Sequence, residues 1–184
     1  MVTTAPGEDR VPALALVNTR RVAADDLATP AAAADWLRGH GLAADVTDAA
    51  ALSRLTDLRA AVRELLAALA EGRAPEAAVV ETVNAAARAD GAALALTWRD
   101  GPSSAWHSTR PGTLDAAVAA LARNAIEVVS GEFGPLIRPC EAHGCIRYFL
   151  REHARRRWCS TTCGDRVRAA RHQRLVVEQR EGSR

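Results

Sequence analysis

The chain has 184 residues and a mass of 19.5 kDa, enough for one medium domain or for one domain with a small module. Charged residues make up 25% and hydrophobic residues 48%, which excludes a wholly disordered chain. No run of 18 apolar residues predicts a membrane span, and the N-terminus lacks the pattern of a signal peptide. We therefore expect a cytoplasmic protein.

The net charge of +2 conceals an uneven distribution of charge along the chain. Residues 1–137 contain 12 arginines against 17 acidic residues, a net charge of −5. Residues 138–184 contain 12 arginines against 5 acidic residues, a net charge of +7. All 24 basic residues are arginine, which a GC-rich genome explains without a functional cause. The asymmetry predicts a basic C-terminal module with a partner of its own.

The N-terminal part begins without a clear pattern. Residues 1–10 are expected to be disordered, and the apolar stretch 11–21 is compatible with a helix or a strand. Thr29 followed by a proline is typical of a helix start, and the helix should end at Gly39 or Gly41.

Two further helices follow in the chain. Thr47 or Asp48 should cap a long helix that ends at Gly72, and a second helix should run over 75–90. In the long helix, apolar residues recur at three- and four-residue spacing and predict one buried stripe. The stripe consists of Leu52, Leu55, Leu58, Val62, Leu65, Leu66 and Leu69.

A β-hairpin and another helix are predicted before the cysteines. Residues 92–99 and 105–108 are expected to form the strands, joined by a turn over 100–104, and a helix should cover 114–130. The hairpin carries Trp98 and Trp106, which either line a small-molecule pocket or pack in the core and across the strands.

All four cysteines lie near the C-terminus, with the spacing C-x4-C-x13-C-x3-C: Cys140, Cys145, Cys159 and Cys163. Two close pairs of thiols separated by a short loop predict a four-thiolate zinc site. Two disulfides are the alternative, which a reducing cytoplasm disfavours. His143 or His153 could also replace one thiol as a ligand.

The residues around the cysteines predict the local fold. Gly144 suits the tight turn of a zinc knuckle, because glycine tolerates a positive φ. Residues 146–150 are expected to form a strand that pairs with 155–160, and a helix should begin near Ser160. Knuckle, hairpin and helix describe a treble-clef-like finger. The predicted fold class is therefore mainly α, with a helical N-terminal domain that contains a small hairpin, and a C-terminal zinc finger.

The cysteine segment resembles the CGNR zinc finger, named after a Cys-Gly-Asn-Arg run at its last cysteine. The run here is Cys163-Gly164-Asp165-Arg166. Asp165, in place of asparagine, adds a negative charge near the expected nucleic-acid face, although an aspartate there can cap the helix.

In that family the finger follows a mostly helical ABATE domain that opens with a Leu-Asp-x-x-Asn-Thr-like stretch. This chain has Leu14-Ala-Leu-Val-Asn18-Thr19, without the acidic residue. The resemblance implies an ABATE-like domain over 11–134, a finger with a basic helix over 135–184, and a stress-induced transcriptional regulator that binds double-stranded DNA.

The composition of the basic end independently favours nucleic-acid binding, because arginine binds phosphate through two parallel hydrogen bonds. The candidate residues are Arg155, Arg156, Arg157, Arg166, Arg168, Arg171 and Arg174. An opposing interpretation is that the twelve arginines of residues 138–184 form a solvated, acid-paired face, and that several of them pair with the acidic N-terminal domain.

Other functions stay open at this point. The chain could be an enzyme or a small-molecule-binding protein with a structural zinc, or a protein-interaction module. No catalytic residues are predicted. The expected roles of the N-terminal domain are sensing a small-molecule effector or forming a homodimer, and the candidate pocket residues are Asn18, Trp98 and Trp106.

Overall fold

A computed structural model describes residues 4–42, 44–98 and 101–181. Within these ranges the fold is mainly α, as predicted, with three two-stranded antiparallel sheets. The helices are α1 (Pro12–Asn18), α2 (Pro30–Gly39), α3 (Ala49–Glu71), α4 (Ala77–Arg88), α5 (Leu114–Ser130), the short 3-10 helix η1 (Gly134–Leu136) and α6 (Thr161–Glu181). The strands are β1 (Arg20–Arg21), β2 (Ala24–Asp25), β3 (Ala93–Trp98), β4 (Pro102–His107), β5 (Ile137–Pro139) and β6 (Tyr148–Leu150).

Side-chain caps fix the starts of three helices. The side chains of Thr29, Asp48 and Thr113 each accept a hydrogen bond from the backbone N–H three residues later. The long helix α3 ends at Gly72, whose φ of 68° is the left-handed conformation that glycine adopts without strain. These boundaries confirm the sequence-based assignment of the helices.

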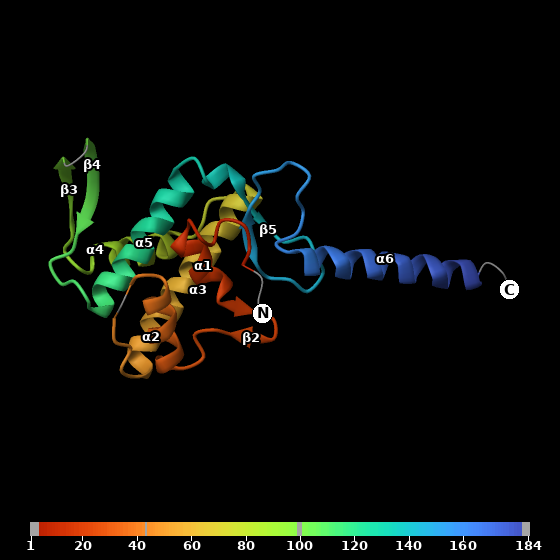
Figure 1. The fold of residues 1–184 in the computed structure, drawn as a ribbon, viewed down its shortest axis with the longest axis horizontal. Coiled ribbons are helices and arrows are strands. Elements are labelled where there is room, and N and C mark those ends of the chain that lie inside the picture. Colours follow the sequence, from red (N-terminus) through yellow and green to blue (C-terminus); the bar gives the residue numbers. More distant parts are fainter. Residues whose placement is uncertain (1–3, 43, 99–100, 182–184) are drawn as a thin grey trace.

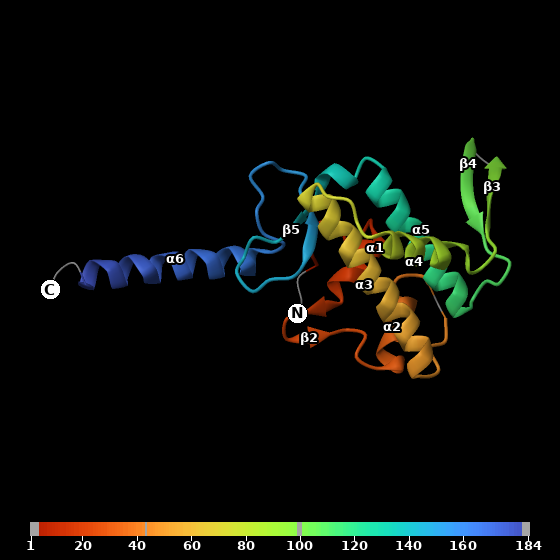
Figure 2. The ribbon, with the colours of Figure 1, turned by 180° about the vertical axis from the view of Figure 1, so that it is seen from behind.

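The helices pack around α3 (Figure 1, and from behind in Figure 2), which contacts α1, α2, α4 and α5. The predicted apolar stripe of α3 is largely buried, with Leu52 and Leu69 at its ends only half-buried. It meets Leu14 and Leu16 of α1 and Leu121 of α5 in one main core. Burial of such a stripe is the principal driving force for the N-terminal fold.

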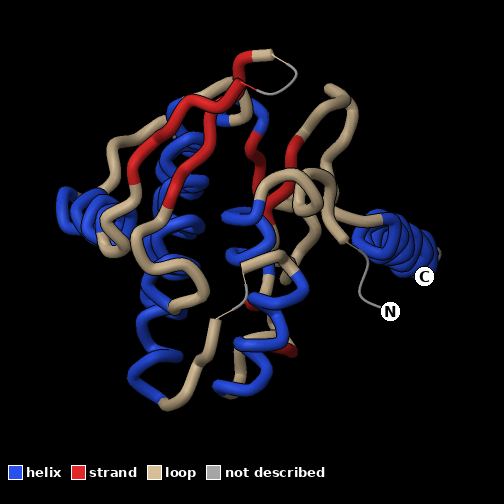
Figure 3. The backbone as a smooth tube through the Cα atoms, turned by 60° about the vertical axis from the view of Figure 1, so that its left-hand side comes forward, coloured by secondary structure: helices blue, strands red, loops and turns tan. Residues whose placement is uncertain are grey.

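The hairpin differs from the prediction in its second strand. β4 begins at Pro102, so that β3 and β4 pair over six residues each, from Ala93 with His107 to Trp98 with Pro102. Residues 102–104 were expected in the turn but belong to the strand, because the two strands stay paired as far as Trp98 and Pro102. The hairpin projects from the helices (Figure 3). Arg99, which the sequence pattern assigned to the first strand, lies outside the described residues.

The strand pairing in the finger was predicted wrongly. β6 pairs with β5, with Ile137 opposite Leu150, and residues 155–157 are not strand. Burial explains the choice, because Ile137 and Leu150 are fully buried in the main core whereas the arginines at 155–157 are exposed. Within the ranges that the structure describes, a single backbone hydrogen bond, from Glu141 N–H to the carbonyl of Arg157, links that segment to the chain after β5.

Disorder was expected over residues 1–10, of which 1–3 lie outside the described residues, and residues 4–10 are ordered, contrary to that expectation. They form turns against the finger, with Ala5 buried and the carbonyl of Pro6 accepting a 2.9 Å hydrogen bond from Leu150 N–H. Gly7 has a φ of +92° and lies so close to Leu150 that a Cβ would overlap its side chain. The segment thus covers one side of β6.

Candidate metal centre and arginine surface

The four cysteines come from two separate segments that the fold brings together. Cys140 follows β5, and Cys145 follows Gly144, whose φ of +70° confirms the predicted knuckle turn. Cys159 precedes α6 and Cys163 lies in its first turn. The local turns present two thiols on each side, as the spacing predicted.

The geometry of the cluster fits a tetrahedral metal. The four Sγ atoms lie within 4.8 Å of one another, and Cys159 Sγ is 3.7 Å from the Sγ atoms of both Cys145 and Cys163. Four sulfurs at about 2.3 Å from a central zinc lie about 3.8 Å apart along the edges of the tetrahedron. No other described residue belongs to this cluster, so His143 and His153 are not among its ligand atoms. All four cysteines are free of disulfides.

The mutual repulsion of the thiolates favours a bound cation at this cluster. Contact with the Cys145 thiol, and then with that of Cys159, lowers the pKa of Cys140. The pKa of Cys159 is raised, first by its contact with Cys140, and that of Cys145 is raised for the same reason. One thiolate therefore opposes the ionisation of its neighbours. Four thiolates need a positive ion to offset their mutual repulsion.

Backbone and side-chain donors surround the sulfurs. Cys159 N–H donates to Cys140 Sγ at 3.3 Å, and the Arg166 guanidinium lies 3.8 Å from Cys163 Sγ. Ser160 Oγ accepts from Cys163 N–H and satisfies one of the free donors at the start of α6. The hydrogen bond from Cys159 N–H favours the thiolate form of Cys140, the form that a metal requires.

A second, smaller core supports the cluster. Phe149 and Ala142 are buried against the cysteines, with Trp158 and Val167 packed on the outside. Three of the thiols are buried and that of Cys145 is half-buried. So few apolar side chains cannot stabilise a fold alone, so a metal bound here would supply much of the stability of the finger.

The first half of the finger is bonded directly to the N-terminal helices. The Asn18 side chain donates to the carbonyl of Tyr148 at 2.8 Å and accepts from its N–H at 2.9 Å. Arg63 of α3 donates to the carbonyls of Val17 and Ile146. Sequence reasoning missed Arg63, because nothing in a helical pattern shows which arginine meets a distant carbonyl.

A buried ion pair adds to this junction. Arg147, two residues after Cys145, pairs with Glu8 at 2.7 Å, and both side chains are about nine-tenths buried. Glu8 also accepts a 2.5 Å hydrogen bond from Asn18. The position of the knuckle is thereby tied to α1 and to the N-terminal turns.

The arginine surface, which we define as the seven predicted arginines at 155–157, 166, 168, 171 and 174, is exposed. Arg157 pairs with Glu141 and Arg168 with Asp165, both within the finger. Among the described residues the other five form no ion pair. None of these seven arginines pairs with an N-terminal acid among the described residues. Of the other arginines of the basic end, Arg147 does, with Glu8, so the opposing interpretation holds for that residue.

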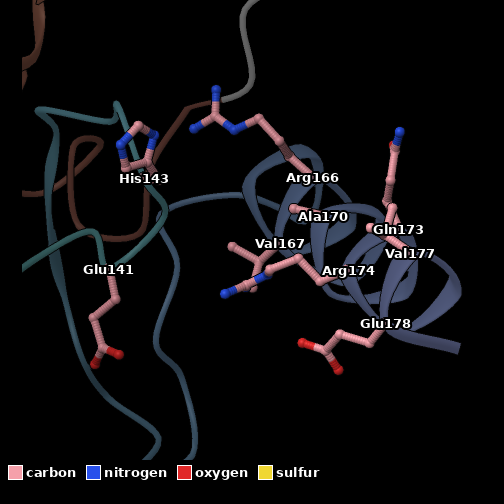
Figure 4. Close-up of a pocket in the computed structure, with 9 residues that line it drawn as sticks. All are labelled: Glu141, His143, Arg166, Val167, Ala170, Gln173, Arg174, Val177 and Glu178. Carbon is pink, nitrogen blue, oxygen red and sulfur yellow. The ribbon is translucent and has the colours of Figure 1, made fainter. Parts of the chain in front are cut away.

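The helix α6 extends away from the rest of the molecule (Figures 1 and 2). Its first turns meet the knuckle, and a groove of about 800 Å3 lies between them. Figure 4 shows the side chains along it, with Arg166, Ala170 and Arg174 on α6 and His143 on the knuckle. The outer turns of α6 are left accessible from several sides.

Comparison with protein families identifies the chain. Residues 10–132 match the ABATE family, described as "Putative stress-induced transcription regulator". The chain belongs to the ABATE family. Residues 137–174 match the CGNR zinc finger, so the two parts follow one another in the order that the resemblance implied. No curated protein matches the chain significantly.

In this ABATE protein, Asp165 stands where the CGNR run has asparagine, and the structure shows where its side chain lies. Asp165 lies inside α6 and does not cap it, contrary to the sequence-based suggestion, because Ser160 already occupies the capping position. The Asp165 carboxylate pairs with Arg168 at 2.5 Å. The guanidinium of Arg168 also lies over the ring of Trp158, 5.9 Å from its centre.

The candidate pocket residues do not lie together. Asn18 lines a polar cavity of about 660 Å3 between α1, α2 and the N-terminal turns. Trp106 lines a separate cleft of about 510 Å3 beside α4 and α5. Trp98 is 71% exposed on the hairpin and stands opposite Pro102, not opposite Trp106. Within the described part of this ABATE protein, none of the helices combines the length and apolar character needed to cross a bilayer.

Proposed function

We propose that this ABATE protein is a zinc-dependent transcriptional regulator that binds double-stranded DNA through the finger over 135–184. The observation that carries the proposal is the free helix α6, which starts at the thiol cluster and bears exposed arginines. A zinc ion bound there by the four cysteines would offset part of the thiolate charge and would join the two halves of the finger. In a reducing cytoplasm the four thiols stay available for it.

The dimensions and charge of α6 suit the major groove. A helix of 21 residues is about 31 Å long and 10–12 Å wide, and the groove is about 12 Å wide. Arg155, Arg156 and Arg171 have no acidic partner among the described residues and are free for phosphate. With Arg166 and Arg174, which also form no ion pair among the described residues, five arginines predict that log K falls with log[salt] with a slope of about −4 to −5.

A salt titration of binding to random duplex DNA, with the metal content measured on the same sample, tests this function. We expect one zinc per chain and the steep slope. Cys159→Ala should lose both zinc and DNA binding. Arg171→Ala should weaken binding on all sequences alike, whereas Arg38→Ala, an exposed arginine of α2, serves as the matched control and should bind as the wild type does. One zinc with no DNA affinity at low salt would refute the proposal.

The N-terminal domain over 11–134 is proposed to sense a small effector in the polar cavity at the junction. Support comes from its lining, since Asn18 and Arg147 also hold the knuckle. A screen of polar metabolites by thermal shift tests this idea. A true effector should stabilise the wild type and lose its effect in Trp36→Ala, because Trp36 forms one wall. Equal shifts in both proteins would refute binding at this cavity.

A further inference from the structure

The β3–β4 hairpin carries an apolar face that the monomer leaves uncovered. Paired residues of an antiparallel ribbon point to the same side, and Leu94 pairs with Trp106 while Trp98 pairs with Pro102. Leu96 shares this face, because side chains alternate along a strand and Leu96 lies two residues from both Leu94 and Trp98. The exposed fractions of these four large residues are 58% for Leu94, 69% for Leu96, 71% for Trp98 and 47% for Trp106.

Contacts of Trp106 attach the base of the hairpin to α5. The indole N–H of Trp106 donates to Glu127 of α5 at 3.3 Å, and the guanidinium of Arg123 lies over its ring at 4.9 Å. Arg123 is itself buried in an ion pair with Asp90. The base of the hairpin is therefore ordered before a partner binds, so binding costs less conformational entropy there.

The chemistry of the hairpin points to another hairpin of the same kind as its partner. Neither β3 nor β4 contains an acidic residue, a lysine or an arginine, so the strands themselves bring no like charges that would oppose self-association. Outward charges are the usual protection of an exposed ribbon. A two-stranded ribbon is also marginal alone and gains from packing against a further layer.

We propose that this apolar face is a self-association surface, through which two copies of the chain pack their hairpins face to face about a twofold axis. At the observed exposed fractions the four side chains leave about 500 Å2 of apolar surface open to water. Complete burial of this surface in two copies would remove about 1,000 Å2 in total from water, which reaches the lower limit for a specific interface. The hairpin and α6 lie at opposite ends of the molecule (Figure 1), so this dimer leaves the arginine surface uncovered.

Sedimentation equilibrium of the full zinc-loaded chain over a concentration series tests the proposal without DNA. The wild type should reach the mass of two chains. Leu96→Lys should weaken the dimer at least about 30-fold, because the substitution sets two charges in the centre of the interface. Leu175→Lys is the matched control, since it makes the same change at a 48% exposed leucine of α6, and it should dimerise as the wild type does.

Two results would overturn the proposal. One is a wild type that stays monomeric up to its solubility limit. The other is a Leu96→Lys variant that dimerises as tightly as the wild type, which would place the interface on another surface. Because Leu96 is 69% exposed in the monomer, the variant should retain its helical circular dichroism signal, and that measurement excludes misfolding as the cause of dissociation.

Discussion

Replacement of Asn18 by alanine tests the junction between the N-terminal helices and the finger. The substitution removes both hydrogen bonds to the backbone of Tyr148 in a place where Asn18 is 3% exposed. The N–H and the C=O of Tyr148 are then left without partners, and each such buried group costs about 1–3 kcal/mol. Glu8 loses one bond but keeps Arg147 and the N–H of Ala5. We expect a total loss of about 3 kcal/mol.

Urea unfolding of the zinc-loaded protein, followed by circular dichroism, measures this loss. It is a large part of the 5–15 kcal/mol that stabilises a typical domain. Asn84→Ala is the control, because it makes the same chemical change at a half-buried site on α4 and should change the stability by no more than about 0.5 kcal/mol. Asn18→Asp should be at least as destabilising as Asn18→Ala, since it removes a donor and sets a carboxylate beside Glu8. A loss below about 1 kcal/mol for Asn18→Ala would refute the role given to this side chain.

Three further perturbations have defined outcomes. The hydrogen bond from Arg123 lowers the pKa of Asp90 from 3.8 to about 2, so this carboxylate contributes stability above pH 4 that is lost as the pH falls through 2. Asp90→Asn should be less stable than the wild type at pH 7, and the gap should narrow by about 2 kcal/mol by pH 2 in urea unfolding; a constant gap would contradict this. Removal of the metal with a chelator should make all four thiols reactive to a thiol reagent and abolish DNA binding, and equal reactivity before chelation would contradict the metal site. Gly7→Ala should cost about 2 kcal/mol or more, because its Cβ would lie 2.5 Å from Leu150 Cγ, whereas Gly41→Ala, with a similar φ and free space, should cost about 1 kcal/mol; equal thermal shifts would contradict the steric argument.

The helices and the metal cluster could be predicted because their signals are local. Thr29 and Asp48 cap helices whose apolar spacing is visible in the sequence, and each cysteine pair closes through a short turn. The predicted knuckle at Gly144 depends only on the φ of one residue. In each case the residues that decide the structure lie within a few positions of one another, where sequence patterns are informative.

The pairing of β5 with β6 could not be predicted in the same way. These strands have three residues each, too few to show alternation, and their pairing depends on the burial of Ile137 in a core built by distant helices. The order of residues 4–10 depends likewise on Leu150, more than 140 positions away. Asn18 was a candidate only because of the family resemblance, and the structure shows that its side chain forms hydrogen bonds to the backbone of the finger.

The structure divides the finger into two halves with different attachments. The half that carries Cys145 is held by Asn18 and Arg63, which bond the backbone on both sides of Arg147. The half that carries α6 has no such bonds to the N-terminal helices among the described residues, and it reaches the first half through the thiol cluster, the small core around Phe149 and the contacts of Glu141. A displacement of α1 or α3 would therefore move the knuckle first, and it would reach the arginine surface through these three links, of which the metal site is one. Loss of the metal should accordingly weaken this coupling, because the thiol cluster is one of the links between the two halves.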